Sequence, residues 1–340
     1  YEAGIKNNIS AFTMALKNNT VNKIVYVDNN SVYPGDGTKN WPYCKISFAI
    51  QNATNGDIIR VFEGDYMEKI IIDKSLSIIG NSSLNTSLIG YYDDFVFLGP
   101  GYKELNNNII TISSDNVKIQ GFKMTTGLGS YFGSSGNIRA CNGIYISNSN
   151  DCEIKNNKFD SHIRDAIIAK KSNNIRMEYN DLTSNGLILD SSNNTIITNN
   201  SMDHLWASRS NNCFIKNNLV YLGKYGITLV YANENRLEKN TLIKCKKRGV
   251  FLKNSNNNFL ERNNFLVEDN IIKKAFSSFF NFRDFLFYES ATFLNSKGNE
   301  WNENYWNRAR AMPKIIIGRR GSEGLIPSFN IDFNPAKEPN

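Results

Sequence analysis

Residue types that bind metals are scarce in this sequence. It has two histidines, His162 and His204, and five cysteines, with no Cys-x-x-Cys pair and no histidine placed to complete a zinc site. We therefore expect no metal and no cofactor. Cys152 and Cys213 are predicted to share one inward column about 14 Å apart, beyond the reach of a disulfide, so the thiols should be reduced.

Long runs of like-charged residues and long hydrophobic runs are also missing. The formal net charge is +7, and Lys and Arg are scattered between Asp and Glu. This balance argues against a nucleic-acid partner but allows attraction to an acidic polysaccharide or an anionic cell surface. The phenylalanine-rich stretch 276–288 is interrupted by Arg283 and Asp284 and is too short to cross a bilayer, so no membrane span is expected.

The sequence does contain a repeat of about 22 residues between Asn142 and Asn270. In each of six copies, an apolar residue is followed three residues later by Asn and five residues later by another apolar residue. The repeated asparagines are Asn157, Asn180, Asn200, Asn218, Asn240 and Asn263. Self-similarity at a fixed period predicts a solenoid.

Side-chain alternation inside each copy shows which residues point inward, because successive residues of a strand point to opposite faces. The predicted inward positions are all apolar: Ile144/Ile146, Ile167/Ala169, Leu187/Leu189, Leu205/Ala207, Ile227/Leu229 and Val250/Leu252. Three short strands per copy, stacked at about 4.8 Å, predict an all-β fold, a single-stranded parallel β-helix. We expect the repeated Asn to occupy a bend with left-handed backbone, where it bonds to the asparagines above and below and has no catalytic role.

Both ends of such a stack expose unpaired backbone groups, so caps are expected. We predict an N-terminal segment at residues 1–56, in which a short helix N-capped by Ser47 covers the first end. The β-helix follows at residues 57–270. A C-terminal aromatic cap, centred on Phe276–Tyr288, and a tail are predicted at residues 271–340.

Motifs at both ends of the chain resemble a known family. The opening contains Tyr26-Val-Asp28, Gly35-Asp36-Gly37, Gly56-Asp57-Ile58, Val61-Phe-Glu-Gly-Asp-Tyr66 and Leu76-Ser-Ile-Ile-Gly80, and the ending contains Asn299-Glu-Trp301, Asn304-Tyr305-Trp306 and Asn330-Ile-Asp332. Together they resemble the NosD-like right-handed β-helix family, also described as carbohydrate-binding and sugar-hydrolysis repeats, and the ending is similar to its archaeal members. The resemblance implies a right-handed β-helix, secreted or surface-anchored, with functions that range from copper-site maturation to sugar binding, hydrolysis and surface display.

These implied functions make different demands on the residues. Copper handling needs clustered His, Met or Cys ligands, which the sequence lacks. Hydrolysis needs paired carboxylates on neighbouring coils, for which Asp160, Asp165, Asp190 and Asp203 are the possible members. The polygalacturonase signatures Asn-Thr-Asp, Gly-His-Gly and Arg-Ile-Lys are absent.

A single bend combines an acid, an imidazole and a guanidinium. It contains Asp160, His162, Arg164 and Asp165, with Lys170 nearby, and is the candidate catalytic site of a polysaccharide lyase or glycoside hydrolase. The alternative is a solvated bend with an ion pair between Lys170 and Asp190 of the next coil.

The outward column of one strand set is the candidate binding surface. It reads Tyr145, Ile168, Ile188, Trp206, Thr228 and Phe251, an almost wholly apolar stripe about 24 Å long on six coils. The tail from Trp301 to Pro339, a neighbouring subunit or surface protein, or a stacked glycan could cover it. An insertion loop at residues 125–141, with Tyr131 and Phe132, is either a second binding element or an excursion without a partner.

We interpret the sequence as an extracellular or cell-surface β-helix module with a structural or adhesive role. Its partner would be a surface protein, a second copy of the chain, or a polysaccharide. The alternative is a polysaccharide lyase or glycoside hydrolase that acts on the outer face of the β-helix.

Overall fold

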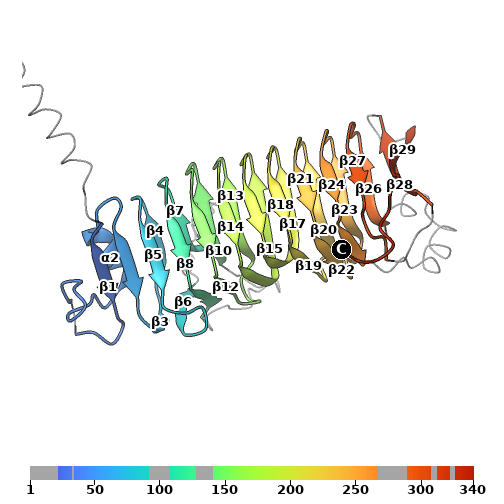
Figure 1. Cartoon of the computed structure of the whole chain (residues 1–340). Coiled ribbons are helices and arrows are strands. Elements are labelled where there is room, and N and C mark those ends of the chain that lie inside the picture. Colours follow the sequence, from blue (N-terminus) through green and yellow to red (C-terminus); the bar gives the residue numbers. More distant parts are fainter. Residues whose placement is uncertain are drawn as a thin grey trace, which may run out of the picture.

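Strands stack in register along one axis in the computed structural model of the chain (Figure 1). The structure describes residues 22–32, 34–91, 107–127, 141–266, 289–307, 312–321 and 326–340. Within these ranges nearly every strand pairs in parallel with the equivalent strand of the coil before and the coil after, which leaves three faces around a central core. The protein is a parallel β-helix, as the repeat predicts.

Face 1 carries one short strand from every coil. Its strands are β1 (Ile24–Val27), β2 (Ile58–Val61), β5 (Ser77–Gly80), β8 (Lys118–Gln120), β11 (Glu153–Lys155), β14 (Arg176–Glu178), β16 (Ile196–Thr198), β18 (Phe214–Lys216), β21 (Arg236–Glu238), β24 (Phe259–Glu261) and β27 (Glu300–Asn302).

Faces 2 and 3 follow in chain order and share two long strands that turn the corner between them, β15 (Asp181–Asp190) and β17 (Ser201–Ser208). The other strands of face 2 are β3 (Gly64–Tyr66), β6 (Thr86–Gly90), β9 (Lys123–Thr126), β12 (Lys158–Phe159), β19 (Leu219–Tyr221), β22 (Thr241–Ile243) and β25 (Asn264–Leu266). The other strands of face 3 are β4 (Ile70–Ile72), β7 (Asn108–Ile112), β10 (Asn142–Ser147), β13 (Asp165–Lys170), β20 (Tyr225–Val230), β23 (Arg248–Lys253), β26 (Glu289–Leu294) and β28 (Lys314–Arg320).

The predicted inward columns form the core. All twelve of these side chains are at most 1% exposed, from Ile144 and Ile146 to Val250 and Leu252. The register aligns each one with its equivalent on the next coil, so like packs on like through the stack. The five cysteines are free; burial raises the pKa of Cys152 and Cys213 to about 11, so their thiols stay protonated at neutral pH.

The repeated asparagines form a continuous ladder at the corner between faces 1 and 2. In each step, the side-chain oxygen of one Asn accepts hydrogen bonds from the backbone and side-chain nitrogens of the Asn one coil earlier, as Asn218 does from Asn200 at 3.0 and 3.1 Å. The six side chains are at most 2% exposed. The expectation of left-handed backbone at these residues is wrong. The residue before each Asn has positive φ instead, for example Tyr179 and Lys239, and this turn directs the asparagine side chain inward.

Two further ladders were not expected from the sequence. Buried serines at the corner between faces 3 and 1, such as Ser172 and Ser192, accept a backbone N–H from the preceding coil. In the later coils, Asn235, Asn258 and Asn299 form a second buried asparagine ladder. It follows Cys213 in the same inward column, so a column that contains Cys152, Ile175, Thr195 and Cys213 in earlier coils continues with amides.

The first end is covered by α2 (Ile46–Asn52), whose residues Ile46, Ala49 and Ile50 are buried in the core cluster. The prediction that Ser47 caps this helix is wrong, because Lys45 is the N-cap residue and makes no side-chain capping bond. Glu68, which is remote in sequence, replaces that capping bond. Its carboxylate accepts hydrogen bonds from the backbone N–H groups of Ile46 and Ser47 and from the Ser47 hydroxyl.

The other described end is covered by the tail. β28 pairs antiparallel with β29 (Ile326–Asp332), and the two strands cross the end of the stack (Figure 1). Beneath them, the rings of Phe265 and Trp306 stack with centroids 4.4 Å apart. Asp332 is fully buried there and accepts hydrogen bonds from Asn304, the last Asn of the ladder, and from the indole of Trp306. The aromatic cap predicted at Phe276–Tyr288 lies outside the described residues.

Candidate functional site

The predicted outward column exists but is not a continuous exposed stripe. Its six residues are aligned on consecutive strands of face 3 and point away from the core. Trp206 is 41% exposed, whereas Thr228 is 2% exposed and the other four side chains are half-buried. Residues stacked at about 4.8 Å shield one another, and the Arg248 guanidinium lies 4.0 Å from the ring centroid of Phe251.

The described part of the tail does not lie over this column, contrary to one of the three expectations. β28 instead adds one more strand to face 3, and Ile317 follows Thr292 as the next outward residue. The proposed binding residues Tyr131 and Phe132 of the insertion lie outside the described residues. A glycan or protein contact at the outward column stays a prediction.

The candidate catalytic bend separates into two groups. His162 Nδ1 lies 2.9 Å from Asp160 Oδ1, while Arg164 Nε donates to Asn142 at 3.0 Å and lies 3.4 Å from Asp165 Oδ2. Asp160 lines the pocket described below, whereas Asp165 is not among the residues that line it.

The alternative prediction for this bend, an ion pair between Lys170 and Asp190, is also wrong. Lys170 and Asp190 are neighbours in register, but the Asp190 carboxylate pairs with Arg209 at 2.6 Å. Arg209 comes from the coil after Asp190, so the inter-coil ion pair exists with a different cation.

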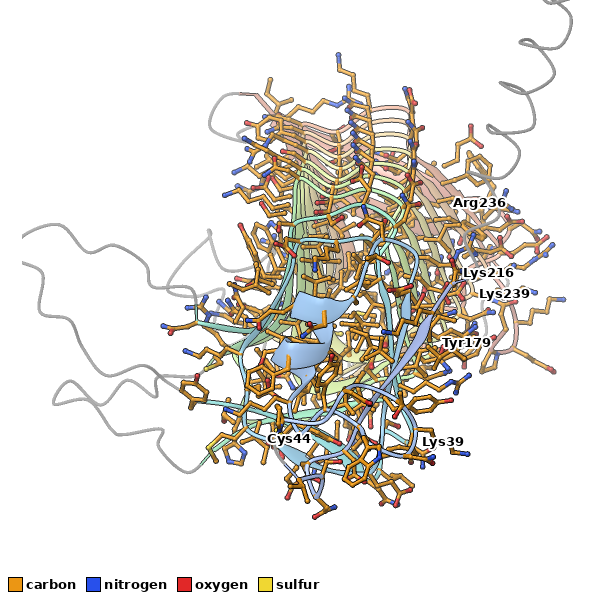
Figure 2. All side chains as sticks on the ribbon, turned by 90° about the vertical axis from the view of Figure 1, so that its left-hand side faces the viewer. Lys39, Cys44, Tyr179, Lys216, Arg236 and Lys239 are labelled. Carbon is orange, nitrogen blue, oxygen red and sulfur yellow. The ribbon has the colours of Figure 1, made fainter. Side chains whose placement is uncertain are left out.

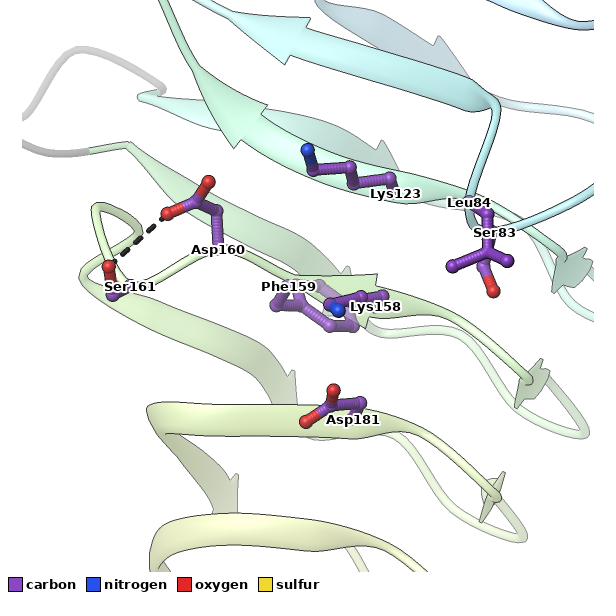
Figure 3. Close-up of a pocket in the computed structure, with 8 residues that line it drawn as sticks. All are labelled: Ser83, Leu84, Lys123, Lys158, Phe159, Asp160, Ser161 and Asp181. Atoms are coloured by element: carbon purple, nitrogen blue, oxygen red, sulfur yellow. Dashed lines mark hydrogen bonds between the residues drawn. The ribbon is translucent and has the colours of Figure 1, made fainter.

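Asp160 also lines a pocket that the sequence analysis did not identify. This open hollow of about 520 Å³ lies on the outer side of face 2, between the bend at Ser83–Leu84 and the strands β9, β12 and β15. Figure 3 shows Lys123, Lys158 and Asp181 on three successive strands, with Asp160 and Ser161 on the bend that follows β12. The register aligns Lys158 with Lys123 on one side and with Asp181 on the other.

A signal for the pocket was present in the repeat. Lys158 and Asp181 each follow a ladder asparagine by one residue, and Lys123 follows Phe122, which occupies the equivalent position one coil earlier. Alternation places this position on the outside of face 2 because the ladder asparagine before it points inward. Reading the column after the asparagines would have found the lysines; the bend at Ser83–Leu84 that bounds the hollow has no such periodicity.

The two lysines of the pocket differ from the paired cations of face 1. On face 1, cations pair with glutamates of adjacent coils, as in Lys118 with Glu153 at 3.2 Å and Lys216 with Glu238 at 2.9 Å. Figure 2 shows Lys216 projecting outward on that side of the stack. Within the described part of the chain, neither Lys123 nor Lys158 lies within 4.0 Å of a carboxylate oxygen.

The acids of the pocket are already hydrogen-bonded. Burial acts to raise the pKa of Asp160, but hydrogen bonds from the His162 side chain and backbone and from the Ser161 hydroxyl outweigh it and lower the pKa below its ordinary value. Asp160 is therefore ionised at neutral pH and is unsuited to act as a general acid. Asp181 accepts a hydrogen bond from the Ser201 hydroxyl at 3.1 Å.

A second hollow, of about 580 Å³, lies beside β1 near the first end. Its carboxylates are satisfied by neighbours: Asp28 accepts from Asn30, and Glu63 accepts from Asn81. In the described ranges no three His, Cys, Asp or Glu side chains are grouped to hold a metal ion. No helix in the same ranges is long and apolar enough to cross a membrane.

Comparison with known proteins identifies the class of fold. Residues 142–305 match the family model described as right handed beta helix region. No curated protein sequence matches the chain. Together with the strand pairing, the family model and the solved structures below establish a right-handed parallel β-helix.

Three solved structures are similar to the chain in fold. Alginate lyase from Paenibacillus sp. str. FPU-7 is 11% identical with a TM-score of 0.55, over 93% of this chain and 98% of that one. DFA-IIIase from Arthrobacter chlorophenolicus A6, in complex with GF2, is 16% identical with a TM-score of 0.54, over 82% and 79%. The Dettilon tailspike protein is 11% identical with a TM-score of 0.52, over 83% of this chain and 62% of the tailspike.

Proposed function

We propose that this protein binds a carboxylated polysaccharide on the outer side of face 2, at the pocket that contains Lys123 and Lys158. One observation carries the proposal: two lysines stand in register on adjacent strands, at the edge of an open hollow, without a carboxylate partner among the described residues. Elsewhere on the surface, several cations in similar columns are paired. Unpaired, aligned ammonium groups favour a ligand that brings its own carboxylates.

The spacing of the lysines suits a polymer. Adjacent strands lie about 4.8 Å apart, which is comparable with the length of one sugar residue, so consecutive uronates along the axis would meet consecutive lysines. The same face continues for several coils past Asp181 and Ser201 to Leu219 and Tyr221, which are 40% and 38% exposed. An extended chain on this face therefore has an apolar platform beyond the charged pocket.

The comparisons support a carbohydrate ligand only by analogy of fold. One structural neighbour is an alginate lyase and another, a DFA-IIIase, was solved in complex with GF2. A glycan ligand is consistent with a location outside the cell, and we include that location in the proposal. We also propose that the chain is of the NosD-like, archaeal surface type, which the motifs at its two ends support.

Binding calorimetry with alginate oligosaccharides and with a neutral glucan of similar length tests the proposal. We expect saturable binding of alginate alone at low ionic strength, weakened about two- to fivefold by Lys123→Gln and by Lys158→Gln, since each change removes a charge contact in the pocket. Lys239→Gln is the matched control, because Lys239 is an exposed lysine at the corner of a distant coil. Equal binding by all three variants, or no preference for alginate, would refute the proposed site.

A polysaccharide lyase or hydrolase at the same pocket is the second candidate. The observation that favours it is that two carboxylates, Asp160 and Asp181, line one hollow. Because Asp160 is ionised, it can act only as a base or nucleophile, and the general acid is unassigned. Incubation with alginate and neutral glycans, followed by assays for unsaturated products and reducing ends, decides between the two. Turnover that Asp160→Ala and Asp181→Ala abolish would replace the binding proposal by the enzymatic one; a catalytic role of Asp165 is tested in the same way.

A further inference from the structure

The outward side of the hairpin β28–β29 is apolar. The register pairs Ile315 with Ile331 and Ile317 with Phe329 across the two strands. Alternation places these four residues on the side away from the stack, while Ile316, which is 1% exposed, faces the core. Figure 1 places the hairpin at the C-terminal end of the solenoid.

The exposure of these residues is high for large apolar side chains. Ile315 is 55% exposed, Phe329 60% and Ile331 37%, and Phe333, directly after β29, is 74% exposed. A solvated antiparallel hairpin normally carries polar residues on its outward side. Among the outward positions of the two strands, the charged residue is Arg319, which pairs with Pro327 at the far end of the hairpin.

The pattern fits a second copy of the same chain as the partner. A twofold contact needs a single self-complementary patch, and here the patch consists of apolar pairs with the charge at the edge. The exposed apolar side chains offer roughly 500 Å² per copy, so two copies would bury about 1,000 Å², the size at which a specific interface becomes credible.

We infer that two copies of this protein associate through the outward sides of their β28–β29 hairpins, related by a twofold axis. This contact is independent of the polysaccharide pocket.

Sedimentation equilibrium of the full chain from about 1 to about 300 µM tests the inference. We expect the 38.6 kDa monomer to convert reversibly into a species of twice that mass as concentration rises. The double change Ile315→Asp and Phe329→Asp should raise the dissociation constant at least about tenfold, because it places charges in the middle of the contact. Ile71→Asp is the matched control, since Ile71 is 62% exposed on β4, near the opposite end.

A cross-link gives a second readout that does not depend on affinity. In a Cys44→Ser background, Phe329→Cys near the twofold axis should form a disulfide-linked dimer under mild oxidation, whereas Ile71→Cys should not. The four remaining cysteines are buried. Three outcomes would overturn the inference: a wild-type protein that stays monomeric over the whole range, a larger assembly, or equal association of the Ile315/Phe329 variant. The apolar face would then bind a different partner.

Discussion

Each mid-ladder asparagine satisfies backbone groups on two neighbouring coils. The Asn218 amide donates to the carbonyl of Ile197 and to the side chain of Asn240, and its oxygen accepts from the backbone and side chain of Asn200. Water does not reach these groups, because Asn218 is 2% exposed. Losing the side chain therefore leaves buried polar groups without partners.

Replacing Asn218 by Leu should lower the free energy of unfolding by about 2 to 4 kcal/mol, since more than one buried group loses its partner. Asp203→Asn, a change on the half-exposed outer side of β17, should alter it by less than about 0.5 kcal/mol. Thermal melts followed by circular dichroism measure the difference. Coincident melting curves would show that the ladder does not stabilise the stack.

Period and alternation alone predicted the ladder residues and the inward columns, because both repeat on every coil. The left-handed residues were missed since their types vary, with Tyr179 and Lys239 at positions where other coils carry Asn. Left-handed backbone favours Asn, Asp and Gly, so Tyr179, Lys239 and Arg262 carry no local signal for it.

At the scale of elements, the last Asn of the ladder depends on one carboxylate of β29. Asp332 Oδ2 accepts from the backbone and side chain of Asn304 and from Trp306 Nε1, and its Oδ1 accepts from the backbone of Asn334. All four partners are donors. An amide at this position would offer one acceptor and turn its NH₂ group towards a donor.

Asp332→Asn should therefore loosen the terminal hairpin. We expect a loss of about 1 to 3 kcal/mol in stability and a red shift of tryptophan emission, because Trp306 is 1% exposed in the folded chain. Glu338→Gln, in the exposed tail, is the control. Unchanged emission and melting in Asp332→Asn would mean that the hairpin is held in place without this carboxylate.

The charged columns of face 1 link stability to pH. The hydrogen bond from Lys216 and the nearby positive charges of Lys216 and Arg236 lower the pKa of Glu238 below its ordinary value of 4.5 and outweigh its burial. A lowered pKa in the folded state means that Glu238 stabilises the protein above pH 4.5 and loses this contribution as the pH falls through the folded-state pKa.

Glu238→Gln should therefore be less sensitive to acid than the wild type. Between about pH 5 and pH 3 the melting temperature of the wild type should fall more steeply, and the two proteins should converge at the acid end. Parallel curves would contradict the assigned role. Lys297→Gln, outside this network, should follow the wild type.

For the whole molecule, the parallel β-helix could be predicted because every coil repeats the same pattern of inward apolar residues and a bend asparagine; the right hand was implied by the family resemblance. The site could be predicted only in part. The alignment of Lys123 with Lys158 follows from the repeat, because each comes one residue after equivalent positions, Phe122 and Asn157, but the bend at Ser83–Leu84 that bounds the pocket lies outside the six-copy repeat. The bend at Asp160 was noticed from its composition, but its charges pair locally rather than converge.

In the proposed complex, Lys158 recognises a carboxylate of the ligand. A thermodynamic cycle tests it most directly: calorimetric affinities of the wild type and Lys158→Gln for an alginate oligosaccharide and for the same oligosaccharide with its carboxyl groups reduced to alcohols. We expect the substitution to weaken binding of the carboxylated form about two- to fivefold at low ionic strength and to leave binding of the reduced form unchanged. Equal losses with both ligands, or no loss with either, would contradict it.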